Sequence, residues 1–160
     1  MSLTIGGSVV SALMMGAAVG KISIGWVMDR LNYGLTILCY GLIGGLGWLG
    51  LIILPTGHDL LFIFSGFLLG IGQGIVLVAL PYVVRKVYGS IDYGDIYASI
   101  TMFGAFAGAI SGYFGGWMFD MTGNYVVSIL INVVLYIIAT PLMATASIKE
   151  IKKDEIALAK

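Results

Sequence analysis

Long apolar runs separated by short polar breaks form the dominant pattern along this chain. The runs cover about residues 3–28, 35–54, 60–82, 95–119 and 125–147, and a polar tail, residues 148–160, follows. A helix needs roughly 20 apolar residues to cross about 30 Å of hydrocarbon at about 1.5 Å per residue. Each run meets this length. The pattern therefore predicts an all-α membrane protein whose residues 1–147 form a half-domain of five transmembrane helices.

The breaks between the runs carry residues typical of turns. The second break contains Pro55 and Gly57, the third contains Gly89 and Gly94, and the fourth is Asp120–Asn124. Because all of the connections are short, each helix must run antiparallel to the one before it.

Composition excludes several classes of protein. The chain is 59% hydrophobic and only 10% charged, whereas soluble domains carry about 25% charged residues. Its formal net charge is zero, so it has no electrostatic footprint for nucleic acid. With one cysteine, Cys39, one histidine, His58, and carboxylates confined to the segment ends, it lacks the residues for a disulfide, a metal cluster or a catalytic constellation. We expect no enzyme activity, no metal and no cofactor.

The basic residues predict the orientation in the membrane. They lie around the first connection, around the third connection and in the tail, at Lys21, Arg30, Arg85, Lys86, Lys149, Lys152, Lys153 and Lys160. By the positive-inside rule these three regions are cytoplasmic, which places the start of the chain outside. An outside start is the expectation for a chain that lacks one or more preceding helices.

Glycine provides a packing signal, at 24 of 160 residues. Gly104, Gly108, Gly112 and Gly116 form a stripe at i, i+4, and Gly66–Gly70–Gly74, Gly16–Gly20 and Gly41–Gly45 repeat the spacing. Small residues at this spacing let helix backbones approach closely in lipid. We therefore expect the first four segments to pack tightly against protein. The fifth segment, residues 125–147, has no glycine, and we expect it to be peripheral and exposed to lipid.

The turn after the first run carries a motif. Gly25 is followed after three residues by Asp29 and Arg30, and Lys21 precedes Asp29 by eight residues. This spacing resembles the loop signature of the major facilitator superfamily of secondary transporters. The usual continuation, a nearby glycine and further basic residues, is replaced here by Leu31-Asn32-Tyr33-Gly34. A degenerate loop of this kind resembles the copy between the eighth and ninth helices of that family.

Two further stretches support this register. Tyr93–Tyr97 is similar to the connection between the tenth and eleventh helices of monocarboxylate and oxalate/formate-type porters, and Gly116–Tyr125 is similar to the end of their eleventh helix. The resemblance implies that the five segments are helices eight to twelve of a twelve-helix, multi-pass transporter of the cell membrane. It also implies a missing amino-terminal half and transport of a small organic solute, such as a carboxylate, with or without a coupling ion.

Each candidate residue has two interpretations. Gly25, Asp29 and Arg30 form a gating loop or mark a solvated helix end. Lys21 lies about 12 Å inside the turn, where it either snorkels to the headgroups or binds an anionic substrate. Gln73, between two glycines in the third segment, either lines the substrate path or makes an interhelical hydrogen bond. Three tyrosines are either interface anchors or cavity hydroxyls: Tyr82, Tyr97 and Tyr113.

A second function class stays open at this point. The same helices and glycine stripes would suit a noncatalytic membrane scaffold or assembly subunit whose loops have no gating role. Solute uptake by the full-length protein would separate this alternative from a transporter.

The charge distribution generates a prediction about topology. In a background with Cys39 replaced by serine, cysteines placed at His58 and Asn124 should react with a membrane-impermeant maleimide added outside the cell. A cysteine placed at Ser90 should be protected, because the basic third connection stays in the cytoplasm. Labelling of the Ser90 position from outside would reverse the assigned orientation.

Overall fold

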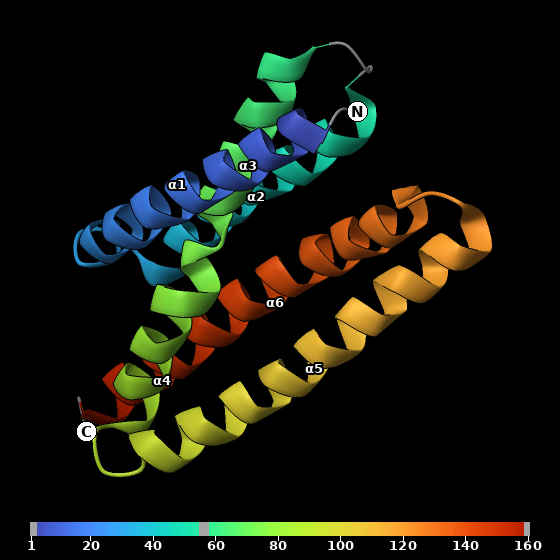
Figure 1. Ribbon diagram of the computed structural model, residues 1–160. Coiled ribbons are helices and arrows are strands. Elements are labelled where there is room, and N and C mark those ends of the chain that lie inside the picture. The colour runs from blue at the N-terminus through green and yellow to red at the C-terminus, as the bar shows by residue number, and fades with distance from the viewer. Residues whose placement is uncertain (1–2, 55–57, 159–160) are drawn as a thin grey trace.

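The computed structural model describes residues 3–54 and 58–158, and every regular element in these ranges is a helix. The elements are α1 (Leu3–Met28), α2 (Tyr33–Ile53), α3 (Asp59–Gly72), the π-helix η1 (Ile75–Ala79), α4 (Leu80–Tyr88), α5 (Tyr93–Thr122) and α6 (Val126–Leu158). Because α3, η1 and α4 follow one another as a single span, five spans are long and apolar enough to cross a membrane. The spans alternate in direction (Figure 1), and the prediction of an all-α fold with five membrane-length helices is confirmed.

The ends of the spans are set by turn residues. Gly123 adopts the left-handed conformation, with φ 70°, and its N–H donates to the carbonyl of Phe119 at 2.8 Å, which closes α5. The side chain of Asn124 then accepts a hydrogen bond from the N–H of Val126 at 3.1 Å, at the start of α6. Gly89, with φ 75°, ends α4 in the same region of φ. Residues with a side chain rarely adopt a positive φ, so both positions favour glycine.

The last helix extends into the polar tail. Residues 148–158 continue α6 as helix. Residues 55–57, with Pro55 and Gly57, and residues 159–160 lie outside the described residues.

Glycines bring the main chains of α1 and α3 into contact. Gly16 meets the backbone of Phe67, and Gly20 meets the backbone of Ile71. On the α3 side, a Cβ added to Gly66 would lie 2.8 Å from the carbonyl oxygen of Val9, closer than real Cβ atoms approach. Helices in lipid associate through such close packing, because lipid tails are as apolar as the side chains.

Glycines of α2 lie in close contact with two helices, α3 and α6. A Cβ on Gly47 would lie 2.7 Å from the carbonyl oxygen of Ser65 on α3, while Gly41 meets the side chain of Thr140 on α6. The hydroxyl group of Tyr136, also on α6, lies against Gly44. Helix α2 therefore packs between α3 and α6.

The structure corrects the expected places of the last two spans. Helix α6 was expected to be peripheral, and most of its span Val126–Thr145 is indeed not buried. One side of it nevertheless packs closely, because Thr140 and Tyr136 fit into glycines of α2, and Val133 and Ala144 are buried. The absence of glycine from α6 was the wrong criterion for predicting whether it packs against another helix. A glycine is needed on only one side of an interface, since the other side then fills the space with a larger side chain.

Helix α5 was expected to be tightly packed, and within this chain it is not. None of its residues is buried, and α5 stands beside α6 as the outer arm of a hairpin (Figure 1). Nothing lies within 4 Å of a Cβ built on any of the stripe glycines, which are Gly104, Gly108, Gly112 and Gly116. The spacing showed that a close approach was possible, but not which helix would make it.

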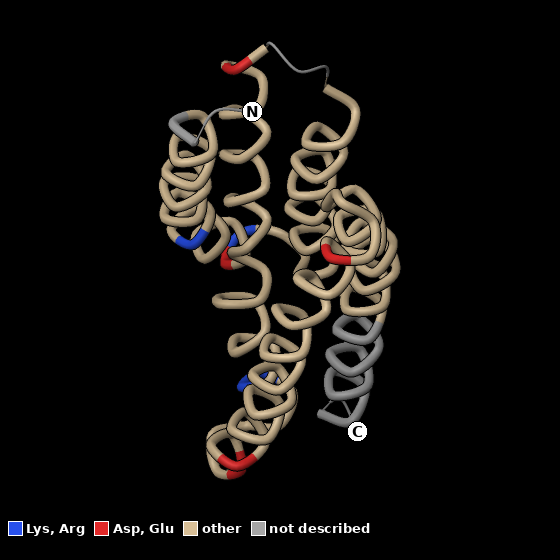
Figure 2. Tube along the Cα trace, turned by 45° about the vertical axis from the view of Figure 1, so that its right-hand side comes forward, with Lys and Arg blue, Asp and Glu red and all other residues tan. Residues whose placement is uncertain are grey.

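A buried cluster marks the place where α1, α2, η1 and α6 meet. Its members are Ile24, Met28, Ile37, Tyr40, Ile75, Ala79 and Ala144. The cluster lies near the end of α1 that carries the Asp29-Arg30 turn, so the turn is supported by packed side chains. Charged residues lie mainly towards helix ends, and the long central stretches of the trace carry few (Figure 2).

The third span is interrupted near its middle. Helix α3 ends at Gly72, Gln73 and Gly74 follow, and η1 then replaces the α-helical pattern before α4 begins at Leu80. Pro81 stands in the first turn of α4, directly after η1, and has no N–H to donate to the preceding turn. The span bends at this break, so α4 diverges from the group formed by α1, α2 and α3 (Figure 1).

The backbone contact between α1 and α3 generates a prediction. Gly70→Ala should lower the melting temperature in detergent, because its Cβ would collide with the carbonyl of Leu13 and lie 2.7 Å from the nitrogen of Ala17. Overpacking of this kind costs about 1–3 kcal/mol. The matched control is Gly45→Ala on α2, which has nothing within 4 Å of its new Cβ and should gain up to about 1 kcal/mol of helix propensity. Equal destabilisation by both changes would contradict the packing.

Candidate functional site

The Asp29-Arg30 turn closes the end of α1. The N–H of Asp29 donates to the carbonyl of Gly25 at 3.3 Å, and the N–H of Leu31 donates to the carbonyl of Val27 at 2.9 Å. These bonds hold the turn in place while the side chains of Asp29 and Arg30 remain exposed. The Asp29 carboxylate is thus presented at one end of the molecule.

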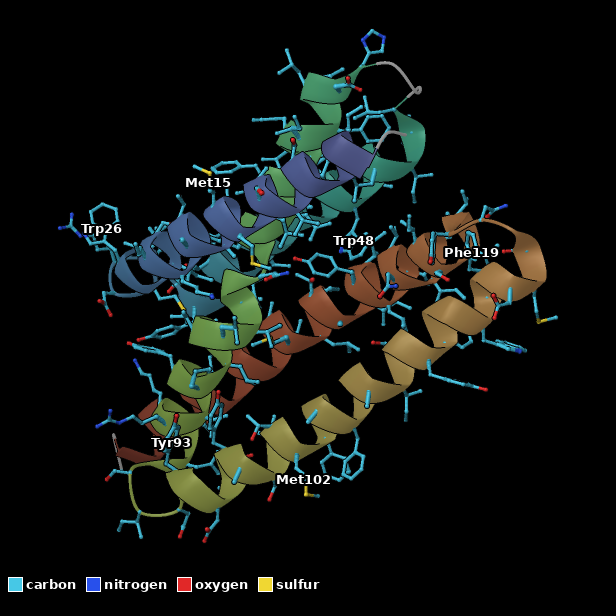
Figure 3. All side chains as sticks on the ribbon, in the orientation of Figure 1. Met15, Trp26, Trp48, Tyr93, Met102 and Phe119 are labelled. Atoms are coloured by element: carbon cyan, nitrogen blue, oxygen red, sulfur yellow. The ribbon has the colours of Figure 1, made fainter. Side chains whose placement is uncertain are left out.

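Arg30 is directed back along α1. Its guanidinium carbon lies 4.2 Å from the centre of the Trp26 ring, a cation–π contact. Figure 3 shows Trp26 projecting outward from this end of α1. The pair forms a basic and aromatic edge beside the turn.

Contacts within the described residues do not require glycine at position 25. It is half-buried, and a Cβ added there would lie 3.9 Å from Cγ1 of Val78, which is ordinary van der Waals contact. The described residues therefore leave room for a small side chain at this position.

Lys21 and Gln73 lie at the same level of the α1–α3 pair. Gly20, which precedes Lys21, packs against Ile71, and a Cβ on Gly74, which follows Gln73, would lie 2.9 Å from the Gly20 carbonyl oxygen. Both polar side chains are exposed within this chain. The packing of the two helices thus places residues 21 and 73 at one level, although they are far apart in the sequence.

Gln73 stands at the break in the third span. Its N–H is shared between the carbonyls of Gly70 and Ile71 as α3 ends, and the π-helix follows after Gly74. Irregular backbone at membrane depth is tolerated where it is buried in protein or lines a water-filled cavity. Single π-turns inside α-helices occur frequently at functional sites. The break therefore marks the level of Lys21 and Gln73 as the candidate site.

The structure brings together three residues that sequence reasoning did not combine. Tyr33, the first residue of α2, lies 3.2 Å from Tyr82 of α4 between their hydroxyl oxygens, and Lys86 donates a hydrogen bond to the Tyr33 hydroxyl. One available signal was the i, i+4 spacing of Tyr82 and Lys86, which puts both on one face of a helix. No sequence pattern indicated that Tyr33, which is 49 and 53 residues from these two, would contact them.

The other two tyrosines have different surroundings. Tyr97 stacks on Tyr93 in the first turns of α5, with ring centres 5.5 Å apart. Tyr113 is 78% exposed on the same helix as the glycine stripe. Neither hydroxyl lies beside Lys21 or Gln73 in the contacts of the described residues.

A separate groove of about 400 Å³ lies between α2 and α6. Leu38, Leu42 and Leu46 line one wall, and Tyr136 and Ile137 line the other. No charged residue lines it. The groove suits a hydrocarbon chain and offers nothing to balance the charge of an anionic solute, so it is not the candidate site.

A metal site finds no support in the part of the chain that the structure describes. No three side chains among its His, Cys, Asp and Glu residues are grouped so that they could hold an ion.

Comparison with known proteins adds one match. A family model described as Major Facilitator Superfamily matches residues 1–157. Neither a curated protein nor a solved structure matches the chain.

Proposed function

The chain belongs to the Major Facilitator Superfamily of transporters, and from this premise we propose that it forms part of a secondary active transporter. The solute we propose is a small organic anion such as a carboxylate, moved by alternating access with or without a coupling ion. The observation that carries the proposal is the position of Lys21 and Gln73 at one level, beside the break in the third span. In transporters, substrate sites lie near the bilayer midplane and are typically built from interrupted helices.

Lys21 and Gln73 are proposed to line the solute path. An ammonium group inside a membrane span is costly unless it is paired or faces water, and an anionic solute would supply that pairing. Gln73 offers an amide that donates and accepts hydrogen bonds and would orient the solute beside the charge. The carboxylate is the proposed class because Lys21 brings one positive charge to this level.

We place the five spans as helices eight to twelve, with an amino-terminal half as the missing partner. The exposed stripe Gly104, Gly108, Gly112 and Gly116 supports this assignment, because α5 carries the spacing of a packed helix and has no buried residue. A helix from the other part of the transporter would cover it. The proposed location is the cell membrane, with the carboxy-terminal tail in the cytoplasm.

The turn at Gly25, Asp29 and Arg30 is proposed as a gating loop. Asp29 stands at the end of its span, too far from the midplane to touch a centrally bound solute. Its exposed carboxylate can instead meet the amino terminus of a helix in the opposing half, whose partial positive charge favours an anion. A contact made in one state only would bias the equilibrium between the inward-open and outward-open states.

Replacement of Asp29 tests the gating role in the full-length transporter. Asp29→Asn should lower the maximal transport rate and leave the apparent substrate affinity within about threefold. Loss of a partly buried contact of about 2 kcal/mol with a helix end would shift the ratio of the two states by up to about thirtyfold. Initial-rate uptake across substrate concentrations measures both quantities. A loss of affinity alone would contradict the gating role.

Replacement of Lys21 tests the substrate path. Lys21→Met should weaken binding of an anionic substrate by about tenfold or more, whereas Lys21→Arg should retain most of it, because only the first change removes the charge that pairs with the solute. A charge-assisted hydrogen bond of about 1.5–3 kcal/mol supplies this magnitude. Uptake competition with neutral and anionic analogues provides the measurement. Equal effects on both analogue classes would indicate that Lys21 only snorkels to the headgroups.

A further inference from the structure

A polar tie joins the first turn of α2 to α4. The hydroxyl oxygens of Tyr33 and Tyr82 are 3.2 Å apart, and their rings lie 5.3 Å apart between centroids. The Lys86 ammonium nitrogen donates a hydrogen bond to the Tyr33 hydroxyl and lies 4.3 Å from the centre of the Tyr33 ring. Tyr33 thus holds two side chains that stand one turn apart on α4.

The tie acts on a helix that has few other buried contacts, among them Val83, which packs against the buried cluster. Val84 is the one buried residue of α4, and Arg85, Lys86 and Tyr88 are exposed. By contrast, α3 is held against α1 and α2 through backbone contacts at Gly66, Gly70 and their neighbours. The two halves of the third span are therefore fixed to the bundle by different means. Backbone contacts at glycines hold α3, whereas side chains hold α4, through the polar tie and the packing of Val83 on the buried cluster.

The two halves meet at a segment suited to bending. Gly72, Gln73 and Gly74 separate α3 from the π-helix, and Pro81 lies just beyond it. Helix kinks are typically found at π-bulges, glycines and prolines. A change of angle at this segment would move α4 without breaking the backbone contacts of α3.

We propose that Tyr33, Tyr82 and Lys86 form a latch that holds α4 in one of two orientations, with the π-helix Ile75–Ala79 as the pivot. When the latch opens, Lys86 and the two hydroxyl groups exchange their mutual contacts for water and headgroups. Because Lys86 is exposed and stands towards the end of its span, this exchange is cheap enough for the latch to be reversible. The three residues are positioning residues, since they act on the helix that follows Gln73 and not on the solute.

Any role of the latch in transport rests on the proposed function. The existence of the latch does not depend on that function. Opening and closing of α4 is a property of the 160-residue chain, which can be measured without any transport assay. A negative result for uptake and a negative result for the latch are therefore distinguishable.

The test is a distance measurement between spin labels on the chain in lipid nanodiscs. Cys39→Ser removes the native thiol, and Leu35→Cys and Tyr88→Cys place labels at exposed positions on α2 and α4. The latched orientation gives one population of distances. Lys86→Gln should raise the ratio of a second, longer-distance population by about tenfold, the size expected from loss of a charge-assisted hydrogen bond. Tyr82→Phe, which keeps the ring and removes a neutral hydrogen bond, should raise the same ratio by about two- to tenfold.

Two matched changes serve as controls. Arg85→Gln removes a neighbouring charge from α4, and Tyr113→Phe removes a tyrosine hydroxyl that is exposed on α5. Both should leave the distance distribution unchanged. Thermal melting in detergent separates a change of orientation from a loss of folding, because Tyr82→Phe should retain the cooperative transition of the parent chain. Unchanged distances in both Tyr82→Phe and Lys86→Gln, with folding intact, would overturn the latch.

Discussion

The main chains of α1 and α3 touch at glycines, and this contact sets the level of the candidate site. Lipid tails are as apolar as the side chains of these helices, so the hydrophobic effect does not drive their association. What remains is dispersion attraction, which falls steeply with separation. Gly16, Gly20 and Gly70 remove the side chains that would hold the backbones apart. This contact fixes the register of the two helices and, with it, the common depth of Lys21 and Gln73.

The main consequence of this packing is that the two halves of the third span, α3 and α4, are held in different ways. Helix α3 is held by backbone contact, and the glycines around Gln73 interrupt the hydrogen-bond pattern just where that contact ends. Beyond the π-helix, α4 depends on side chains such as Tyr82. The interruption thus serves two purposes. It lies at the level of Lys21 and Gln73, and it is the pivot of the proposed latch.

The two outer spans show how much a helix interface depends on both partners. Thr140 and Tyr136 of α6 enter spaces left by Gly41 and Gly44 of α2, so a helix without glycines of its own packs closely against its neighbour. Helix α5 has the more regular glycine pattern, yet none of its residues is buried in this chain. A pattern on one helix states how closely a neighbour can approach. It does not supply the neighbour, which is why the proposed amino-terminal half matters for α5.

The sequence by itself determined the number of spans, their helical nature and the residues of the turns, because these depend on interactions within a span or a few neighbouring residues. About 20 apolar residues satisfy the bilayer wherever they occur, and Gly123 closes α5 through its own backbone conformation. Only the tertiary structure decided which spans touch, where the third one breaks, and that Tyr33 meets Tyr82 and Lys86 across 49 and 53 residues. Gly72-Gln73-Gly74 reads as part of a continuous apolar run, since a helix tolerates glycine at a modest cost of about 1 kcal/mol. Contacts between distant segments depend on the shapes of both surfaces and on the register in which they pack, and neither is encoded in the pattern of a single helix.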